Sequence, residues 1–394
     1  MIKTATHVTA GDVYVISGQS NAWAIDYNHA YNDDDLPADA QWVRTIGAMH
    51  VYNKSAIYPE ATNTNWYLAR GKAPDVRGGT QLVGNGMIGV LGLNIGMNLI
   101  ASEGVPIAII NGAGGGGAIS FYQKTKNVDL DSPYGRLHYR LEASGFKNKI
   151  KAFIWNQGEG NADDSVLDYQ TSLNQLYKDF KTDYTFEKFY LIQTPPGCNS
   201  KNGHQNVREA QRQFAKTQEK VKILTRHGFP SNPKSENGTY FLSDGCHYHA
   251  VGYEILGKWI SNMAKNDFYG ALVDFEAPQL IGVTLESSTS LVIEFDKPIA
   301  IQPELIIGEI KYDLKDYAFA INNKRTTAIS NLEIDPKNPK QLRLNFSKQT
   351  IYKGDTLTYI LTDNYPESSI PYQGPWLTDF STGVGAIGFT EVVK

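Results

Sequence analysis

Four short polar segments of the chain carry side chains that could together hydrolyse an ester. Ser20 follows the apolar run Val13–Ile16 in GDVYVISGQSNAW, and His247 lies three residues after Asp244 in SDGCHYHAVGY. A serine hydroxyl becomes an effective nucleophile when a histidine accepts its proton and a carboxylate holds that histidine in one tautomer. These residue types predict acyl transfer that uses Ser20, His247 and Asp244.

The spacing of Asp244 and His247 permits two interpretations. On one turn, the carboxylate can bind Nδ1 of the imidazole and leave Nε2 to face a serine. The same spacing is typical of a helix start, with Asp244 as the N-cap residue and His247 in the first turn. Likewise, Gly-Gln-Ser-Asn after an apolar run is also an ordinary turn. The spacing alone leaves these alternatives open.

The two remaining segments could stabilise an oxyanion. In IINGAGGGGAI, glycines at 112 and 114–117 would let backbone N–H groups approach a ligand closely, and in FIWNQGEGN the carboxamide of Asn156 or Gln157 could donate. A phosphate loop would need a following Gly-Lys-Ser/Thr, which is missing, and a dinucleotide loop would need an acidic ribose partner. A plain turn after a strand is the other interpretation of both segments.

The elements that must position these segments follow from the pattern of residues 12–265. Short apolar runs typical of buried parallel strands alternate with helix-period stretches such as DDSVLDYQTSLNQLYKDF, HQNVREAQRQFAKTQEK and HAVGYEILGKWISNMAK. The runs are Val13–Ile16, Pro106–Ile110, Ala152–Trp155, Phe189–Gln193 and Val221–Thr225. This alternation predicts an α/β fold with a parallel sheet, in which ligands bind at the carboxyl ends of the strands.

After Asn266 the pattern changes to period-two alternation with turn signals about every ten residues. Such a pattern predicts an antiparallel β-sandwich. We therefore expect a catalytic domain over residues 1–276 and an accessory sandwich domain over residues 277–394.

Composition excludes several classes of protein. The net charge of −4 and the pI near 6.1 give no footprint for nucleic acid, and no apolar run is long enough for a membrane span. The two cysteines, Cys198 and Cys246, could pair or both be free. The polar start MIKTATHVTAGD holds no signal peptide, and we expect a secreted or periplasmic protein whose signal peptide is absent from this sequence. Composition gives no indication of the oligomeric state.

In order and spacing, the motifs GDVYVISGQSNA, GGGAI, WNQGEG and DGCHYHAVGY resemble those of the SGNH (GDSL-like) hydrolases. The resemblance covers about residues 11–262 and is greatest to the carbohydrate O-acetylesterases, which include sialate O-acetylesterases and acetyl xylan esterases. It implies an SGNH-type, flavodoxin-like three-layer α/β/α domain and a serine esterase that needs no metal or cofactor. By motif, Ser20 is the nucleophile, His247 the base, Asp244 its orienting carboxylate, and Gly116 and Gln157 the oxyanion donors.

The resemblance also implies residues that bind an acetylated carbohydrate such as a sialic acid, a xylan or a related glycan. These are Gln19, Asn21, Trp23, Gly115, Tyr122 and Glu159, and for Glu159 a structural hydrogen-bonding role is the first expectation. Ala22 and Trp23 stand where sialate-type members often have methionine, and Tyr122 stands where a tryptophan is common. These differences predict an altered acceptor pocket, in which Trp23 and Tyr122 stack on a sugar or pack into the core.

Two other functions remain open. One is a non-catalytic glycan-binding protein on a hydrolase scaffold, which the presence of all three triad residues disfavours. The other is an SGNH lipase or thioesterase. Such an enzyme would need a long apolar groove, whereas residues 27–76 are rich in Asn, Asp and Tyr.

Overall fold

The computed structural model of the protein describes residues 9–25, 36–49, 62–71, 85–126, 129–196, 198, 204–230, 240, 244–307, 310–361 and 374–394. In the polar stretch 27–76, residues 27–35, 50–61 and 72–76 lie outside these residues. Within the described parts, no helix combines the length and the apolar character needed to cross a membrane.

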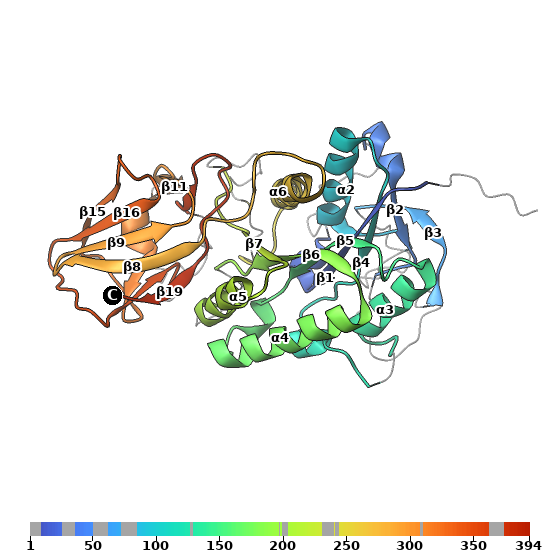
Figure 1. The fold of residues 1–394 in the computed structure, drawn as a ribbon, viewed down its shortest axis with the longest axis horizontal. Coiled ribbons are helices and arrows are strands. Elements are labelled where there is room, and N and C mark those ends of the chain that lie inside the picture. The colour runs from blue at the N-terminus through green and yellow to red at the C-terminus, as the bar shows by residue number, and fades with distance from the viewer. Residues whose placement is uncertain are drawn as a thin grey trace, which may run out of the picture. The chain divides into compact units, whose positions relative to one another are not determined.

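A seven-stranded sheet forms the centre of the α/β region, with the order β3-β2-β4-β1-β5-β6-β7 (Figure 1). The strands are β1 (Asp12–Gly18), β2 (Val43–Ile46), β3 (Trp66–Leu68), β4 (Ile107–Asn111), β5 (Ile150–Asn156), β6 (Phe186–Gln193) and β7 (Val221–Thr225). Strand β1 pairs in parallel with both β4 and β5, whereas β3 is antiparallel to β2. Strands β2 to β4 lie on one side of β1, and strands β5 to β7 lie on the other. The direction in which strands are added thus reverses at β1, and in open α/β sheets ligands bind at the carboxyl end of the strands at such a point.

Helices flank this sheet on two faces (Figure 1). The helices are α1 (Ser20–Trp23), α2 (Gly89–Glu103), α3 (Pro133–Ser144), α4 (Val166–Asp183), α5 (Gln205–Thr217) and α6 (Ala250–Phe268). Gly92 of α2 lies against Ile16 and Ile109, where an added Cβ would be only 3.3 Å from either side chain. On the other face, Phe180 of α4 packs against Phe153 of β5 with ring centroids 4.2 Å apart.

The described chain forms two compact units. The first comprises Met1–Asn156, Gln175–Tyr190 and Tyr253–Leu272, and the second comprises Gln157–Asn174, Leu191–Gly252 and Val273–Lys394. The second unit therefore combines the segment that holds α5 and β7 with the C-terminal strands. The predicted domains over residues 1–276 and 277–394, and the separate folding of the second, stay predictions.

The C-terminal strands form the predicted antiparallel sandwich. One sheet has the order β15-β16-β9-β8 and the other β14-β13-β17-β19. The strands are β8 (Leu280–Ser287), β9 (Ser290–Phe295), β13 (Phe319–Ile321), β14 (Lys324–Arg325), β15 (Ile329–Ile334), β16 (Gln341–Phe346), β17 (Thr356–Tyr359) and β19 (Phe389–Val392). Buried side chains of both sheets, such as Ile293 and Leu357, share one apolar core.

Smaller elements complete the second unit. Strands β10 (Ile299–Ile301) and β18 (Leu377–Asp379) form one two-stranded pair, and β11 (Leu305–Ile307) and β12 (Ile310–Tyr312) form another. A short helix, α7 (Leu314–Tyr317), begins after Asp313, whose side chain caps it.

The five strands expected from apolar runs are confirmed as β1, β4, β5, β6 and β7. Strands β2 and β3 were not expected, because β2 is only four residues long and β3 is partly exposed, so neither gives a clear apolar run. Helix α2 was also missed. Its residues are buried on nearly all sides, so its sequence lacks the one-sided periodicity of an amphipathic helix.

Candidate active site

Ser20 lies where β1 ends and the four-residue helix α1 begins. The turn requires Gly18, which has a φ of +133° and would bring an added Cβ within 2.1 Å of the Asn156 carbonyl oxygen. The next amide, that of Gln19, donates to the same carbonyl at 3.1 Å. Ser20 is 7% exposed. The serine therefore occupies a backbone position fixed by the neighbouring strand β5.

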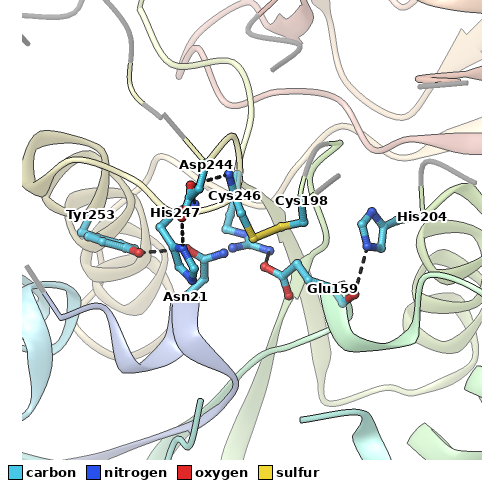
Figure 2. Close-up of a disulfide and its surroundings, with 9 residues drawn as sticks. Asn21, Glu159, Cys198, His204, Asp244, Cys246, His247 and Tyr253 are labelled. Atoms are coloured by element: carbon cyan, nitrogen blue, oxygen red, sulfur yellow. Dashed lines mark hydrogen bonds and ion pairs between the residues drawn. A yellow bond between two sulfur atoms is a disulfide. The ribbon is translucent and has the colours of Figure 1, made fainter. Parts of the chain in front are cut away.

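Asn21 stabilises this turn through hydrogen bonds to its side chain and to its backbone carbonyl. Its Oδ1 accepts a hydrogen bond from the Tyr253 hydroxyl at 2.8 Å (Figure 2). Its backbone oxygen accepts one from the Asn156 side chain at 3.0 Å. Asn21 and Gln19 are both buried. In this structure Asn21 and the backbone amide of Gln19 hold the turn in place, and the contact of the two side chains with substrate stays a prediction.

The two aromatic side chains expected near a sugar are buried. Trp23 is 3% exposed and packs its ring against Gly115, and Tyr122 is 1% exposed and donates to the Gly114 carbonyl at 2.7 Å. Of the two alternatives for these residues, the structure favours packing. Both side chains shape the backbone of the glycine-rich loop that follows β4.

Gly116 is the exposed point of this loop. Its φ of +67° lies in the left-handed region, and the space where a side chain would stand is open. The Gly114 amide donates to the Gly18 carbonyl at 3.0 Å, which joins the glycine-rich loop to the end of β1. The loop and the turn that carries Ser20 are thus held together by a backbone contact, and Gly116 stays the predicted oxyanion donor.

Asp244 and His247 form one compact turn in the second unit (Figure 2). Asp244 Oδ2 lies 2.5 Å from His247 Nδ1, and Oδ1 accepts from the backbone amides of Cys246 and His247. Burial alone would raise the pKa of the Asp244 carboxyl, but the hydrogen bonds from His247 and these amides lower it. An ionised carboxylate only accepts, so Nδ1 carries the proton and Nε2 is the basic nitrogen.

Asp244 does not cap a helix, because α6 begins only at Ala250. The helix-start interpretation of the Asp-x-x-His spacing is therefore wrong, and the carboxylate–imidazole pair is the arrangement observed. His249 lies two residues further on, where its amide donates to the Tyr240 carbonyl at 2.9 Å.

A disulfide joins Cys246, inside this turn, to Cys198 (Figure 2). The Cys198 amide also donates to the Gly245 carbonyl at 3.0 Å. The sequence left the pairing of the two cysteines open, and the structure pairs them. The turn that carries His247 is therefore cross-linked to the segment that follows β6.

Gln157, the first residue after β5, lies in a buried network of amides. Its Oε1 accepts from the Tyr169 hydroxyl at 3.0 Å, and its Nε2 donates to Asn161 Oδ1 at 2.7 Å. Asn161 presents its oxygen to Gln157 because its own Nδ2 donates to the Asp164 carboxylate, which can only accept. The network fixes which end of the Gln157 amide carries the hydrogens, as an oxyanion donor requires.

Glu159 is held in a buried ion pair and not at the surface. Its Oε1 binds Arg226 NH2, and the two side chains are 2% and 0% exposed. The Glu159 carbonyl accepts from Nε2 of His204 at 3.1 Å. Burial, together with the nearby Arg208, lowers the pKa of His204 to about 4, so this histidine is neutral at pH 7. The expected substrate contact of Glu159 stays a prediction.

The described residues thus bring together the ends of β1, β4 and β5, and separately join Asp244 to His247. Sequence reasoning missed Tyr253, Tyr169 and Arg226, which fix Asn21, Gln157 and Glu159. A buried tyrosine or arginine carries no local signal, because its partner lies far away in the sequence. In the described parts of the chain, no group of three or more His, Cys, Asp or Glu side chains is arranged to hold a metal ion.

Comparison with known proteins gives one family and several related structures. The family described as "Carbohydrate esterase, sialic acid-specific acetylesterase" matches residues 10–265. No curated protein matches the chain. A carbohydrate acetylesterase from Xanthomonas citri is 17% identical, with a TM-score of 0.63 over 96% of this chain and 80% of that one.

Two further solved structures are similar over a smaller part. A protein from Arabidopsis thaliana is 19% identical, with a TM-score of 0.47 over 66% of this chain and 99% of its own. NanS is 14% identical, with a TM-score of 0.42 over 66% and 98%. At these identities the Xanthomonas structure supports the fold alone. The family match is what bears on the chemistry.

Proposed function

The chain belongs to the carbohydrate esterase family of sialic acid-specific acetylesterases and is a carboxylic ester hydrolase; from that premise we propose that it removes O-acetyl groups from a carbohydrate through an acyl-enzyme on Ser20. The observation that carries this proposal is the Asp244–His247 pair, with 2.5 Å between Oδ2 and Nδ1. A carboxylate in that position keeps the proton on Nδ1 and makes Nε2 a base.

The proposed reaction has two halves. Ser20 Oγ attacks the acetyl carbonyl while its proton passes to His247 Nε2, and the oxyanion accepts hydrogen bonds from the Gly116 amide and Gln157 Nε2. The C–O bond to the sugar then breaks, and the leaving oxygen takes the proton from His247. Water attacks acetyl-Ser20 in the second half with His247 as base, acetate leaves, and Ser20 regains its proton.

Covalent connection supports the meeting of Ser20 and His247. Six residues after His247, the chain reaches Tyr253, whose hydroxyl binds Asn21, the neighbour of Ser20. Six residues span at most about 20 Å when fully extended. The anchor at Tyr253 therefore limits how far His247 can lie from the nucleophile.

The substrate that we propose is an acetylated sugar, such as a sialic acid, a xylan or a related glycan. The description of the family as sialic acid-specific supports sialic acid among these. Ala22, Trp23 and Tyr122 differ from the residues common in sialate-type members, so all three kinds of sugar stay candidates. Acetate release from acetylated sialic acid, xylan and pectin would rank them. We also propose a secreted or periplasmic location, which the Cys198–Cys246 disulfide supports, since such bonds persist in oxidising compartments.

Single and double substitutions test the proposed mechanism. Ser20→Ala and His247→Ala should each nearly abolish hydrolysis of p-nitrophenyl acetate. The double variant should lose little more, because triad members act as one unit. His249→Ala is the matched control and should retain wild-type kcat.

A fluorophosphonate probe followed by peptide mapping should label Ser20 and no other serine. Labelling of another serine, or equal damage from His249→Ala, would show that the triad is assigned wrongly. A wild-type chain that binds acetylated glycans but turns over no ester would instead indicate a binding protein.

A further inference from the structure

Arg226, the residue that follows β7, contacts two segments of the proposed active site. Its side chain is fully buried, and NH2 binds Oε1 of Glu159. Its Nε and NH1 have no partner among the described residues, so within them Glu159 is the counter-charge of this guanidinium. A buried charge with one counter-ion holds that partner firmly, because losing it would leave the charge uncompensated.

The contact of Arg226 with Glu159 also restrains Gln157, the proposed oxyanion donor. Glu159 is two residues after Gln157, and the loop between them turns sharply at Gly158, where an added Cβ would lie 1.9 Å from Thr194 Oγ1. The backbone after Gln157 therefore has little room to move. Fixing the Glu159 carboxylate fixes the direction in which the Gln157 loop leaves β5.

The backbone carbonyl of Arg226 is linked to the turn of His247, the proposed general base, through Tyr248. The hydroxyl of Tyr248, the residue after His247, donates to the Arg226 carbonyl at 3.0 Å. The Tyr248 ring is 1% exposed, lies 5.9 Å from the guanidinium carbon of Arg226, and packs edge-on against Phe229. Since adjacent residues share a peptide plane, the anchor on Tyr248 limits the orientation of the His247 backbone.

Hydrogen bonds to C-terminal residues hold the segment around Arg226 in place. Thr225 Oγ1 donates to the Gly385 carbonyl at 2.8 Å, and the Gly385 amide donates to the His227 carbonyl at 3.1 Å. The Gln302 side chain donates to the Gly228 carbonyl at 3.0 Å. Residues on both sides of Arg226 are thus fastened.

We propose that Arg226 is a positioning residue for the esterase reaction, which holds the oxyanion loop through Glu159 and the His247 turn through Tyr248. The inference rests on the proposed function for the roles of Gln157 and His247. The link itself rests on the buried contacts alone. If Arg226 has this role, disturbing either contact lowers kcat more than it changes KM.

The test uses Tyr248→Phe, which removes one hydroxyl, Arg226→Lys, which keeps the charge, and Arg226→Met, which removes it. With p-nitrophenyl acetate, Tyr248→Phe should lower kcat about 10-fold and Arg226→Met about 100-fold with KM within a factor of two, because small misplacements of catalytic groups cost this much. Arg226→Lys should retain more activity than Arg226→Met. Circular dichroism and a thermal melt establish that each variant is folded.

Matched controls come from the second unit. Tyr359→Phe removes a buried hydroxyl that accepts from the Leu377 amide, and Arg212→Lys alters the buried pair of Arg212 with Glu209. Both should lower the Tm without lowering kcat. If they lower kcat as much as the Tyr248 and Arg226 variants, or if those variants keep wild-type kcat, Arg226 is structural only and the proposal is overturned.

A readout independent of activity separates this proposal from the proposed function. The NMR resonance of the proton between His247 Nδ1 and Asp244 should shift in Tyr248→Phe and Arg226→Lys and stay unchanged in the two controls. An inactive wild-type chain with these shifts would reject the esterase mechanism and keep the link. An active chain without them would reject the link.

Discussion

At the scale of single residues, the structure assigns different tasks to side chains that look alike in the sequence. Asn156 and Gln157 are adjacent amides at the end of β5, yet Asn156 donates to the Asn21 backbone, whereas Gln157 is oriented by Tyr169 and Asn161. An amide that is already held in one orientation can stabilise a developing charge without reorganising. Gln157 is therefore the better candidate of the two for the oxyanion donor.

We expect Gln157→Ala to lower kcat by about 10²–10³ with little change in KM, because the lost hydrogen bond strengthens as the oxyanion develops. Steady-state kinetics with p-nitrophenyl acetate measure both constants. Gln175→Ala, which removes an exposed amide that donates to Asp179 on α4, is the control. An unchanged kcat in Gln157→Ala would transfer the role to Asn156 or Asn161.

Which residues could be predicted from the sequence depended on whether their partners lie nearby in the chain. Asp244 and His247 are three residues apart, so one turn suffices to join them, and the pair is confirmed. Trp23 and Tyr122 were expected at a sugar or in the core, and only the fold decides between these. Arg226 and Glu159 are 67 residues apart and could not be paired from the sequence.

At the scale of elements, the turn that carries His247, the proposed general base, depends on a cross-link more than on regular structure. Residues 244–249 belong to no helix or strand, and the Cys198–Cys246 disulfide ties them to the chain after β6. Cys246 also donates its amide to Asp244. A covalent bond close to Asp244 restricts the turn where secondary structure does not.

We expect the double variant Cys198→Ser, Cys246→Ser to be less stable than wild type by about 2–4 kcal/mol, the usual contribution of a disulfide. It should also have a lower kcat, because the Asp244–His247 turn can then sample other conformations. Urea unfolding and kinetics measure the two effects.

Dithiothreitol serves as the control for the disulfide variants. It should lower the stability and kcat of the wild type toward the values of the double variant and leave the double variant unchanged. If kcat stayed at the wild-type value after full reduction, the disulfide would add stability without positioning the base.

At the scale of the whole molecule, the second unit buries charged and titratable groups where the α/β segment meets the C-terminal strands. His227 is fully buried, and its Nε2 lies 2.6 Å from the Ala386 carbonyl oxygen, to which it can only donate. Arg208 NH2 donates to the Ile360 carbonyl at 2.7 Å. Because His227 can take up a proton, the stability of this unit depends on pH.

We expect acid to destabilise the protein through His227. Burial, with smaller contributions from Arg208 and Arg226, lowers its pKa to about 3, against about 6.5 in the unfolded chain. The folded state therefore binds this proton less readily. The stability that the neutral ring contributes is complete above pH 6.5 and is lost as the pH falls from 6.5 toward 3.

Urea midpoints measured from pH 7 to pH 4 should fall less steeply in His227→Gln than in the wild type. Burial raises the pKa of Glu276 to about 7, which opposes the trend because the neutral acid stabilises the fold at low pH, but this effect is common to both proteins. His138→Gln, at a partly exposed histidine, is the control. Identical slopes for His227→Gln and the wild type would exclude His227 as the cause.

The C-terminal region, which the sequence pattern assigns to an accessory domain, contacts residues 225–229 through Gly385, which lies between β18 and β19. An added Cβ at Gly385 would lie 2.4 Å from the His227 ring and 2.5 Å from its carbonyl oxygen, so Gly385→Ala forces the C-terminal segment away from residues 225–229. Overpacking of this kind costs about 1–3 kcal/mol. Because Arg226 lies in the displaced segment, the variant should have both a lower Tm and a lower kcat.

Gly282→Ala in β8 is the matched control, since an added Cβ there meets nothing within 4 Å. It should leave the Tm and kcat unchanged. Differential scanning calorimetry and acetate release measure the two quantities for both variants. A Gly385→Ala protein with a lowered Tm and wild-type kcat would mean that the C-terminal strands only stabilise the fold. A parallel loss of both would mean that the contacts of the C-terminal segment with residues 225–229 also support the proposed active site.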